Sequence, residues 1–169
     1  MKTRNLIRLT ALLIAIVSLS VAGCKKDKVD QGAIDNKLIL AYIQANNITA
    51  KATGSGLYYV VTTPGDATRP LLTSTVYVKY RGYVLNGTVK GTQFDSSYEL
   101  SEQPAQFTMS GLIKGFSEGL MQFGKGGKGT LIIPSTLGYG STAQGVEGQL
   151  NYIPANSVLI FDIELTTFQ

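Results

Sequence analysis

The fold is decided by the stretch Gly111-Leu112-Ile113-Lys114-Gly115-Phe116-Ser117-Glu118-Gly119-Leu120. Its apolar residues recur at the spacing of one face of an α-helix. The chain around it instead alternates apolar and polar residues between turn signals, and this pattern predicts strands at residues 57–62, 75–84, 106–109, 128–133 and 158–167. One helix among these strands predicts an α+β fold, in which a curved antiparallel β-sheet wraps around a short α-helix.

A second helical pattern precedes the strands, at residues 34–46, and predicts an N-terminal amphipathic helix. Its apolar face is formed by Ile34, Leu38, Ile39, Tyr42 and Ile43. A single apolar stripe usually buries against the core of its own domain. We therefore favour a lid packed on the domain over a dimerisation face or a substrate-holding face.

The start of the chain has the order of a secretory signal. Three basic residues, Lys2, Arg4 and Arg8, precede an apolar stretch at residues 9–21, and small residues then precede the single cysteine, Cys24. The apolar stretch is shorter than the roughly 20 residues that span a bilayer. This length favours a cleaved signal over a permanent transmembrane helix.

Val21-Ala22-Gly23-Cys24 resembles the lipobox of bacterial lipoproteins, in which the cysteine is lipidated and becomes the N-terminus after cleavage. The alternative is a plain signal peptide with an incidental cysteine. The lipobox implies a protein of the bacterial cell envelope that is lipid-anchored through Cys24, on the periplasmic or surface side, with the outer membrane as the expected membrane. The expected organisation is a signal peptide with a lipobox at residues 1–23, a lipid-anchored tether with the amphipathic helix at residues 24–53, and a folded domain at residues 54–169.

Composition excludes several classes of function. The 169 residues include no histidine, which removes Ser/His/Asp and Cys/His catalysis as well as HExxH zinc sites. One cysteine forms neither an intramolecular disulfide nor a cysteine-rich metal cluster. Without the three basic residues of the signal, 12 of the 15 basic residues remain against 11 acidic ones, with no dense basic stripe for a phosphate backbone.

One glycine-rich segment has the letters of a nucleotide-binding motif. Gly124-Lys125-Gly126-Gly127-Lys128-Gly129 fits GxGxxG, but it follows the predicted helix and precedes a strand, which is the reverse of a dinucleotide site. We interpret it as a turn. The sequence therefore predicts no cofactor, no metal site and no nucleic-acid partner.

Further blocks accompany the helical segment in a fixed order. They are Val78-Lys79-Tyr80-Arg81-Gly82-Tyr83, Phe94-Asp95-Ser96-Ser97, Gln106-Phe107, Leu131-Ile132-Ile133-Pro134, Gly138-Tyr139-Gly140, Ile153-Pro154-Ala155-Asn156-Ser157 and Leu159-Ile160-Phe161-Asp162-Ile163-Glu164-Leu165. Together with residues 111–120, these blocks resemble the FKBP family of peptidyl-prolyl cis/trans isomerases. The resemblance covers residues 54–168.

The resemblance implies a substrate pocket. The catalytic residues it implies are Tyr80, Asp95, Ile113 and Tyr139. The substrate-binding residues it implies are Phe94, Phe107, Leu112, Phe116, Ile153 and Phe161. Without the family, Asp95 could equally cap the turn that follows it, and the apolar residues could belong to an ordinary core.

The family assigns a role to several of these positions. The carboxylate matching Asp95 lies beside the tyrosine matching Tyr80, at the polar edge of the pocket. The backbone N–H of Ile113 holds the substrate carbonyl, and Tyr139 donates a second hydrogen bond. Phe116 forms the floor under the proline ring. The resemblance also implies a macrolide as a ligand of the same pocket.

The implied chemistry needs neither a nucleophile nor a metal, because a prolyl bond rotates over a barrier of about 18 to 20 kcal/mol without bond breaking. An apolar, aromatic pocket desolvates the amide and so favours the twisted transition state. The implied function is a peptidyl-prolyl cis/trans isomerase that assists the folding of unfolded, proline-containing exported polypeptides. The alternative is a non-catalytic peptide-binding or chaperone module on the same fold, which is expected to lack several of the pocket residues.

Three features depart from the family pattern. Phe116 stands where tryptophan is the commonest floor residue, which leaves a shallower aromatic contact. Leu100 stands where many members carry an arginine that supports the aspartate. The segment 140–152 is longer than usual, and its glycines predict a flap over the pocket that tolerates trimming of residues 143–148.

Overall fold

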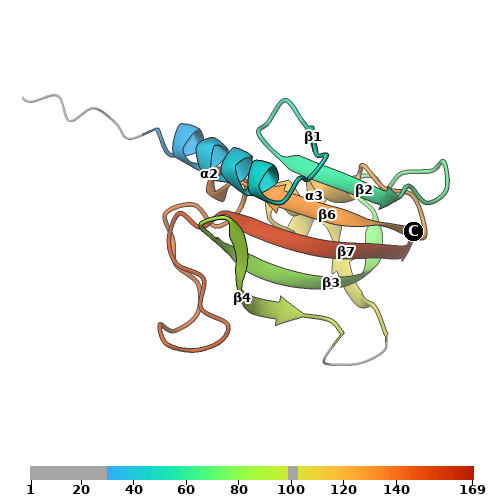
Figure 1. Cartoon of the computed structure of the whole chain (residues 1–169). Coiled ribbons are helices and arrows are strands. Elements are labelled where there is room, and N and C mark those ends of the chain that lie inside the picture. The colour runs from blue at the N-terminus through green and yellow to red at the C-terminus, as the bar shows by residue number, and fades with distance from the viewer. Residues whose placement is uncertain (1–29, 99–102) are drawn as a thin grey trace, which may run out of the picture.

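The structure, a computed structural model, describes residues 30–98 and 103–169. Within them, one antiparallel sheet has the strand order β1-β2-β6-β7-β3-β4, and β5 pairs with β3 beside this path. The strands are β1 Lys51–Ala52, β2 Tyr58–Thr63, β3 Thr75–Asn86, β4 Val89–Ser96, β5 Ala105–Thr108, β6 Gly127–Ile133 and β7 Leu159–Phe168. Helix α3 (Lys114–Leu120) lies behind the sheet in Figure 1, and helix α2 (Gln31–Ala45) lies in front of it. The predicted α+β fold is confirmed.

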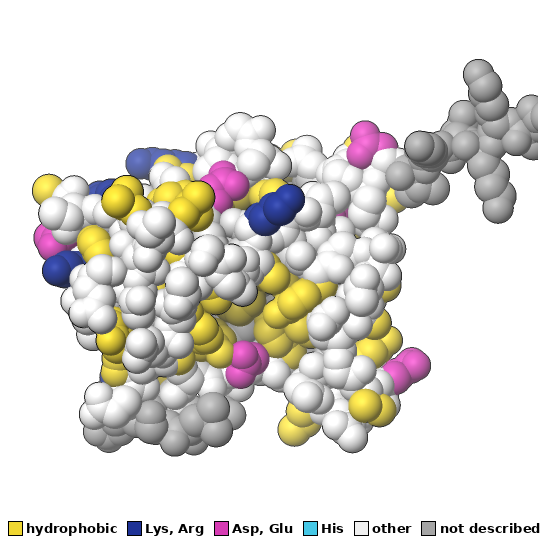
Figure 2. Space-filling model, turned by 180° about the vertical axis from the view of Figure 1, so that it is seen from behind, with side chains coloured by type: hydrophobic (Ala, Val, Ile, Leu, Met, Phe, Trp, Pro, Cys, Tyr) yellow, Lys and Arg dark blue, Asp and Glu magenta, His cyan; other side chains and the backbone are white. Residues whose placement is uncertain are grey.

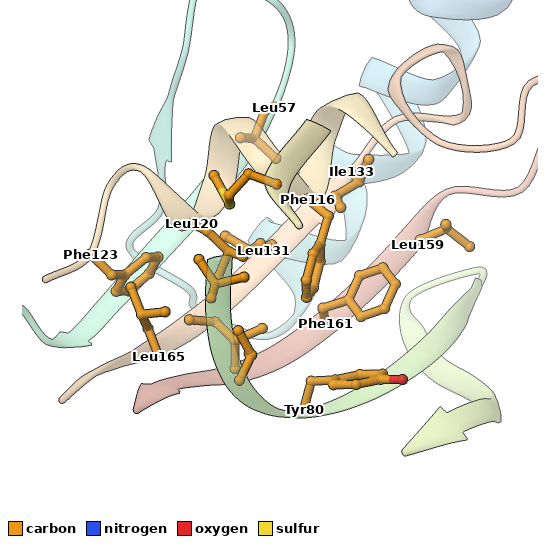
Figure 3. Packing of buried hydrophobic residues seen from close by; sticks show 14 of the residues in the cluster. Leu57, Tyr80, Phe116, Leu120, Phe123, Leu131, Ile133, Leu159, Phe161 and Leu165 are labelled. Atoms are coloured by element: carbon orange, nitrogen blue, oxygen red, sulfur yellow. The ribbon is translucent and has the colours of Figure 1, made fainter. Parts of the chain in front are cut away.

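The sheet separates two apolar layers, because successive side chains of a strand point to opposite faces. Leu131 and Ile133 of β6 belong to the main core with α3. Ile132, between them, packs on the other face with Ile39 and Tyr42 of α2. Figure 3 shows the main core, with α3 side chains directed at the sheet.

Two glycines bring α3 close to β6. A Cβ atom on Gly115 would overlap Ile133, and one on Gly119 would overlap Leu131. On the same helix, the buried Ser117 hydroxyl donates a hydrogen bond of 2.7 Å to the carbonyl oxygen of Met109. This bond ties the short 3-10 helix η1 (Met109–Gly111) to α3 and so fixes the connection between them, residues 112–113.

Helix α2 packs on its own domain, as the favoured interpretation predicted, but its buried face differs from the predicted one. Ile39 and Tyr42 are buried, whereas Ile34 and Leu38 are 42% and 40% exposed. Asp35, which lies between Ile34 and Leu38 in the sequence, is fully buried. The apolar pattern could not indicate this, because the partner that satisfies this carboxyl group lies about a hundred residues further along the chain.

The sheet begins slightly before residue 54, where the sequence placed the start of the folded domain. Helix α2 and strand β1 lie in residues 24–53, the range predicted to hold the tether and the amphipathic helix, and Lys51 and Ala52 pair with Tyr59 and Tyr58 of β2. The five predicted strands correspond to β2, β3, β5, β6 and β7. None of the helices in the described part of the chain is long and apolar enough to cross a bilayer.

Strand β4 was not predicted from the sequence. Its first four residues, 89–92, are mostly exposed and show no clean alternation, so the pattern carries no strand signal. Its pairing with β3 is also irregular, with register shifts on both sides of Tyr83. β4 matters for the site because its last residues are Phe94, Asp95 and Ser96.

Candidate active site

A pocket of about 210 Å³ opens between α3 and the concave side of the sheet. The face shown in Figure 2 is hollowed between two protruding parts of the molecule, and hydrophobic side chains gather along the hollow. The pocket is lined by Tyr80, Phe94, Asp95, Phe107, Gly111, Leu112, Ile113, Phe116, Tyr139 and Phe161. These residues come from β3, β4, β5, β7, the end of η1 and the connection to α3, α3 itself and the segment after β6.

Aromatic rings form the floor and the walls. The ring of Phe116 meets that of Phe161 edge-on, with centroids 4.8 Å apart, and its centroid lies 6.0 Å from that of Tyr80. Phe94 packs against Phe161 with a centroid distance of 5.6 Å. Figure 3 shows Phe116 and Phe161 pointing toward each other, with Tyr80 beside them on β3. Edge-to-face contacts of this kind are favourable arrangements of aromatic rings and restrict their orientation.

The polar edge of the pocket is a hydrogen-bonded pair. The Tyr80 hydroxyl donates to Oδ2 of Asp95 over 2.6 Å, and the backbone N–H of Ser96 donates to Oδ1 of Asp95 over 2.8 Å. Both carboxyl oxygens therefore have a donor. Burial raises the pKa of Tyr80 well above its usual value, and the hydrogen bond to Asp95 raises it further. Tyr80 thus remains protonated and keeps donating at physiological pH.

The two serines of the Phe94-Asp95-Ser96-Ser97 block hold this pair in place. The backbone N–H of Tyr80 donates to the Ser97 hydroxyl oxygen over 2.9 Å, and the Ser97 N–H donates to the Tyr80 carbonyl oxygen over 3.0 Å. Ser96 and Ser97 are both buried. The end of β4 is therefore fixed to β3 at the residue whose hydroxyl meets Asp95.

Two groups at the pocket are available to a ligand. Tyr139 lies at the mouth, 36% exposed, and burial together with the negative charge of Asp95 raises the pKa of its phenol. Among the hydrogen bonds of the described residues, none uses the Tyr139 hydroxyl or the backbone N–H of Ile113. Ile113 instead uses its carbonyl oxygen, which accepts from Phe116 and Ser117 at the start of α3. A ligand carbonyl could thus accept from both groups.

The structure brings together nine of the ten pocket residues implied by the resemblance. Ile153 is absent from the pocket wall: it is buried in the main core, and its backbone pairs with Gln144. Gly111 lines the pocket but was not expected there, because a glycine without a side chain leaves no chemical signal in the sequence. Segment 140–152 contributes no lining residue, so in this structure it does not cover the pocket as predicted.

Two positions singled out in the sequence, Leu100 and Cys24, lie outside the described residues. Within the described ones, no group of three or more Cys, Asp or Glu side chains is arranged to hold a metal ion. The chemistry available at the pocket is therefore that of aromatic walls, two hydroxyl donors, one carboxyl group and one backbone N–H.

The family profile of FKBP-type peptidyl-prolyl cis-trans isomerases matches residues 67–166. The chain belongs to this family. The matched region of the FKBP chain begins before β3 and contains every residue that lines the pocket. The match thus covers the short blocks and the segments between them, from before β3 to residue 166 in β7.

Known FKBP relatives agree with this assignment. The chain is 36% identical over 157 residues to the FKBP-type peptidyl-prolyl cis-trans isomerase FkpA of Escherichia coli, an alignment that covers 93% of this chain and 53% of that protein. The crystal structure of Escherichia coli FkpA matches with a TM-score of 0.65 and 33% identity, covering 100% of this chain and 73% of that one. A peptidyl-prolyl cis-trans isomerase from Pseudomonas syringae matches with a TM-score of 0.63 and 27% identity, covering 81% of this chain and 95% of that one.

The chain spans about half the length of the curated FKBP relatives it matches. The shared part includes the pocket, while the remainder of those relatives has no counterpart in the alignment. These relatives agree with the family, and the pocket residues of this chain are what bear on its own activity.

Proposed function

We propose that this chain catalyses the cis/trans isomerisation of peptide bonds that precede proline. The observation that carries the proposal is the aromatic pocket, which combines the hydrogen-bonded Tyr80–Asp95 pair with an available N–H group on Ile113. The conditions for this reaction are an apolar space for the proline ring and a donor for the substrate carbonyl. The pocket offers both.

In the proposed mechanism the proline ring rests on Phe116, which is 3% exposed and held by Tyr80 and Phe161. The N–H of Ile113 and the hydroxyl of Tyr139 bind carbonyl oxygens of the substrate. The aromatic walls exclude water from the amide, which weakens its planar, charge-separated form relative to the twisted transition state. No covalent intermediate is formed, since rotation alone completes the reaction.

The walls also set the preferred substrate. The residue before proline would lie against Phe94, Phe107 and Ile113, which line the pocket with apolar surface. Peptides with an apolar residue before proline should therefore be favoured. A macrolide would occupy the same walls, with a shallower contact on Phe116 than a tryptophan would give.

The clients we propose are unfolded, proline-containing exported polypeptides, and the site of action is the bacterial cell envelope. The signal-like residues 1–23 and the lipobox cysteine, Cys24, support this location. The bacterial origin of the relatives is compatible with it. The proposed lipid would hold the chain at a membrane, in the periplasm or at the surface.

The decisive experiment follows cis-to-trans conversion of a peptide with an apolar residue before proline, using residues 25–169. The uncatalysed conversion takes tens to hundreds of seconds, so acceleration is easily measured. We expect acceleration by the native sequence and a clear loss in Asp95→Leu, which leaves the Tyr80 hydroxyl without its acceptor. Gly54→Ala, at a site with no atom within 4 Å of the added carbon, is the control.

The alternative function makes a distinct prediction for the same protein. If the folded chain binds proline-containing peptides in the pocket but accelerates none of them, the domain is a peptide-binding module. Retention of nine implied pocket residues favours the isomerase, because a module without catalysis is expected to have lost several.

A further inference from the structure

We infer that Asp35, on the N-terminal helix α2, is a positioning residue that acts through Ser135 on Tyr139. The inference rests on the proposed isomerase function, in which Tyr139 donates a hydrogen bond to the substrate. Asp35 lies on the far side of the sheet from α3, in a helix that contributes no residue to the pocket. Its link to the site runs through the backbone.

The Asp35 carboxyl group is completely buried and fully bonded. Its Oδ2 accepts the backbone N–H of Ser135 over 2.7 Å and the Ser135 hydroxyl over 2.6 Å. Its Oδ1 accepts the side-chain amide of Gln31 over 2.7 Å. A buried carboxyl group is costly unless such donors surround it, so this contact is a specific feature of the fold.

Ser135 passes this constraint to Tyr139. Its carbonyl oxygen accepts the N–H of Gly138 over 2.9 Å and the N–H of Gly140 over 2.9 Å, which are the two neighbours of Tyr139 in the chain. Ser135 is 1% exposed, and among the described residues Asp35 is the acceptor for both of its donors. One serine thus connects the buried carboxyl group to both sides of Tyr139.

Tyr139 depends on this backbone support. Within the described residues its hydroxyl has no hydrogen-bond partner, and its side chain is more than one-third exposed, at 36%. Its placement at the pocket mouth is therefore set by the conformation of residues 138–140. A bond from the Asn156 N–H to the Gly140 carbonyl oxygen, 2.7 Å long, holds the other side of this turn. Loss of Asp35 should consequently loosen Tyr139 without releasing the whole segment.

The test is a double-mutant cycle between Asp35→Ala and Tyr139→Phe in residues 25–169. Alanine is a good helix former without an acceptor, so the N–H and the hydroxyl of Ser135 both lose their partner. We expect Asp35→Ala to lower kcat/KM several-fold, and by no more than Tyr139→Phe, for which the loss of one hydrogen bond should cost up to about tenfold. In the Tyr139→Phe background, Asp35→Ala should have almost no further effect. Multiplicative effects, or a fully active and folded Asp35→Ala protein, would overturn the inference.

The matched control is Asn36→Ala. Asn36 is the next residue of α2 and accepts a hydrogen bond of 2.9 Å from the Tyr58 hydroxyl, so its loss loosens α2 on the sheet without involving Ser135. Asn36→Ala should leave kcat/KM unchanged. Should Asp35→Ala reduce the folded fraction, Ser135→Ala removes only the hydroxyl donor and enters the same cycle. Multiplicative effects of Ser135→Ala and Tyr139→Phe would equally count against the inference.

Hydrogen exchange gives a readout that does not depend on activity. The amide protons of Gly138 and Gly140 should exchange faster in Asp35→Ala than in the native sequence or in Asn36→Ala, while those of β6 and β7 remain protected. If the native protein proved inactive, the proposed function would fail, and these two amides would still decide whether Asp35 positions the turn. Unchanged exchange at both would refute the positioning role.

Discussion

Gly82 sets the spacing of the aromatic wall of the pocket. It lies on β3 opposite Phe161 on one side and Asp95 on the other. A Cβ atom at this position would lie 2.7 Å from Cζ of Phe94 and 2.8 Å from Cε1 of Phe161. The two rings can meet above the strand because this residue has no side chain.

We expect Gly82→Ala to destabilise the domain and to reduce isomerase activity. Overpacking of a filled core typically costs about 1 to 3 kcal/mol, which exceeds the roughly 0.5 to 1 kcal/mol gained from a stiffer unfolded chain. Urea unfolding and the peptide assay measure the two effects. Gly54→Ala, which meets no atom within 4 Å, should show neither. Native stability and activity in Gly82→Ala would mean that the rings adjust freely.

Tyr80 provides a prediction about pH. Burial and the bond to Asp95 raise its pKa in the folded protein, so the folded state keeps the phenol proton at a pH where the unfolded chain, with a pKa near about 10, releases it. This contribution is complete below about pH 10 and is lost as the pH rises above it. The free energy of unfolding should therefore fall more steeply above pH 10 in the native protein than in Tyr80→Phe, by up to about 1.4 kcal/mol per pH unit. Urea titrations between pH 8 and 11 would show this difference, and parallel curves would contradict it.

At the residue level, the sequence indicated those pocket residues whose side chains can be recognised, and it missed those that act without a side chain. Tyr80, Asp95 and the phenylalanines could be matched to a family, whereas Gly82 and Gly111 act through the absence of a side chain. Ile153 was placed by its family block, but it packs in the core, with its backbone paired to Gln144.

Among the elements, those with regular periodicity were predicted well. β6 and β7 bury nearly all of their apolar side chains, and α3 combines apolar spacing with glycines that permit close packing. β4 was not predicted, because its first residues are mostly exposed and do not alternate, although its partner β3 directly precedes it in the chain. The buried face of α2 was not predicted either, because the partner of Asp35 lies about a hundred residues further along the chain. A periodic pattern records which residues are apolar and holds no information on a carboxyl group that a remote serine satisfies.

Segment 140–152 should tolerate shortening. Its base is closed by two backbone hydrogen bonds between Gln144 and Ile153, of 2.9 and 3.0 Å, whereas Val146 and Leu150 beyond it are 62% and 81% exposed. Deleting residues 145–148 keeps the closed base, and loop length changes stability by only about 0.6 kcal/mol per doubling. The melting temperature should stay within a few degrees while preference among protein substrates changes. A loss of cooperative unfolding would show that these residues are structural.

On the scale of the whole molecule, the proposed anchor makes a separate prediction. Replacing Cys24 with serine should release the protein from the membrane fraction and remove acyl mass from its N-terminal peptide, because no other cysteine can accept the lipid. Cell fractionation and mass spectrometry measure the two effects. Ser20→Ala, just outside the lipobox, serves as the control and should remain lipidated. Lipid labelling that persists in Cys24→Ser would refute the lipobox.

The position of β7 in the sheet determines when the domain can fold during synthesis. β7 separates β6 from β3, and it is the last of the described strands to leave the ribosome. Before it is available, the two strands it joins have no common neighbour, and pairing between such distant segments is slow because chain closure precedes any gain in contacts. A nascent chain thus lacks the complete sheet until β7 has left the ribosome, and the proposed export through a narrow channel would require a chain that has not yet completed its fold.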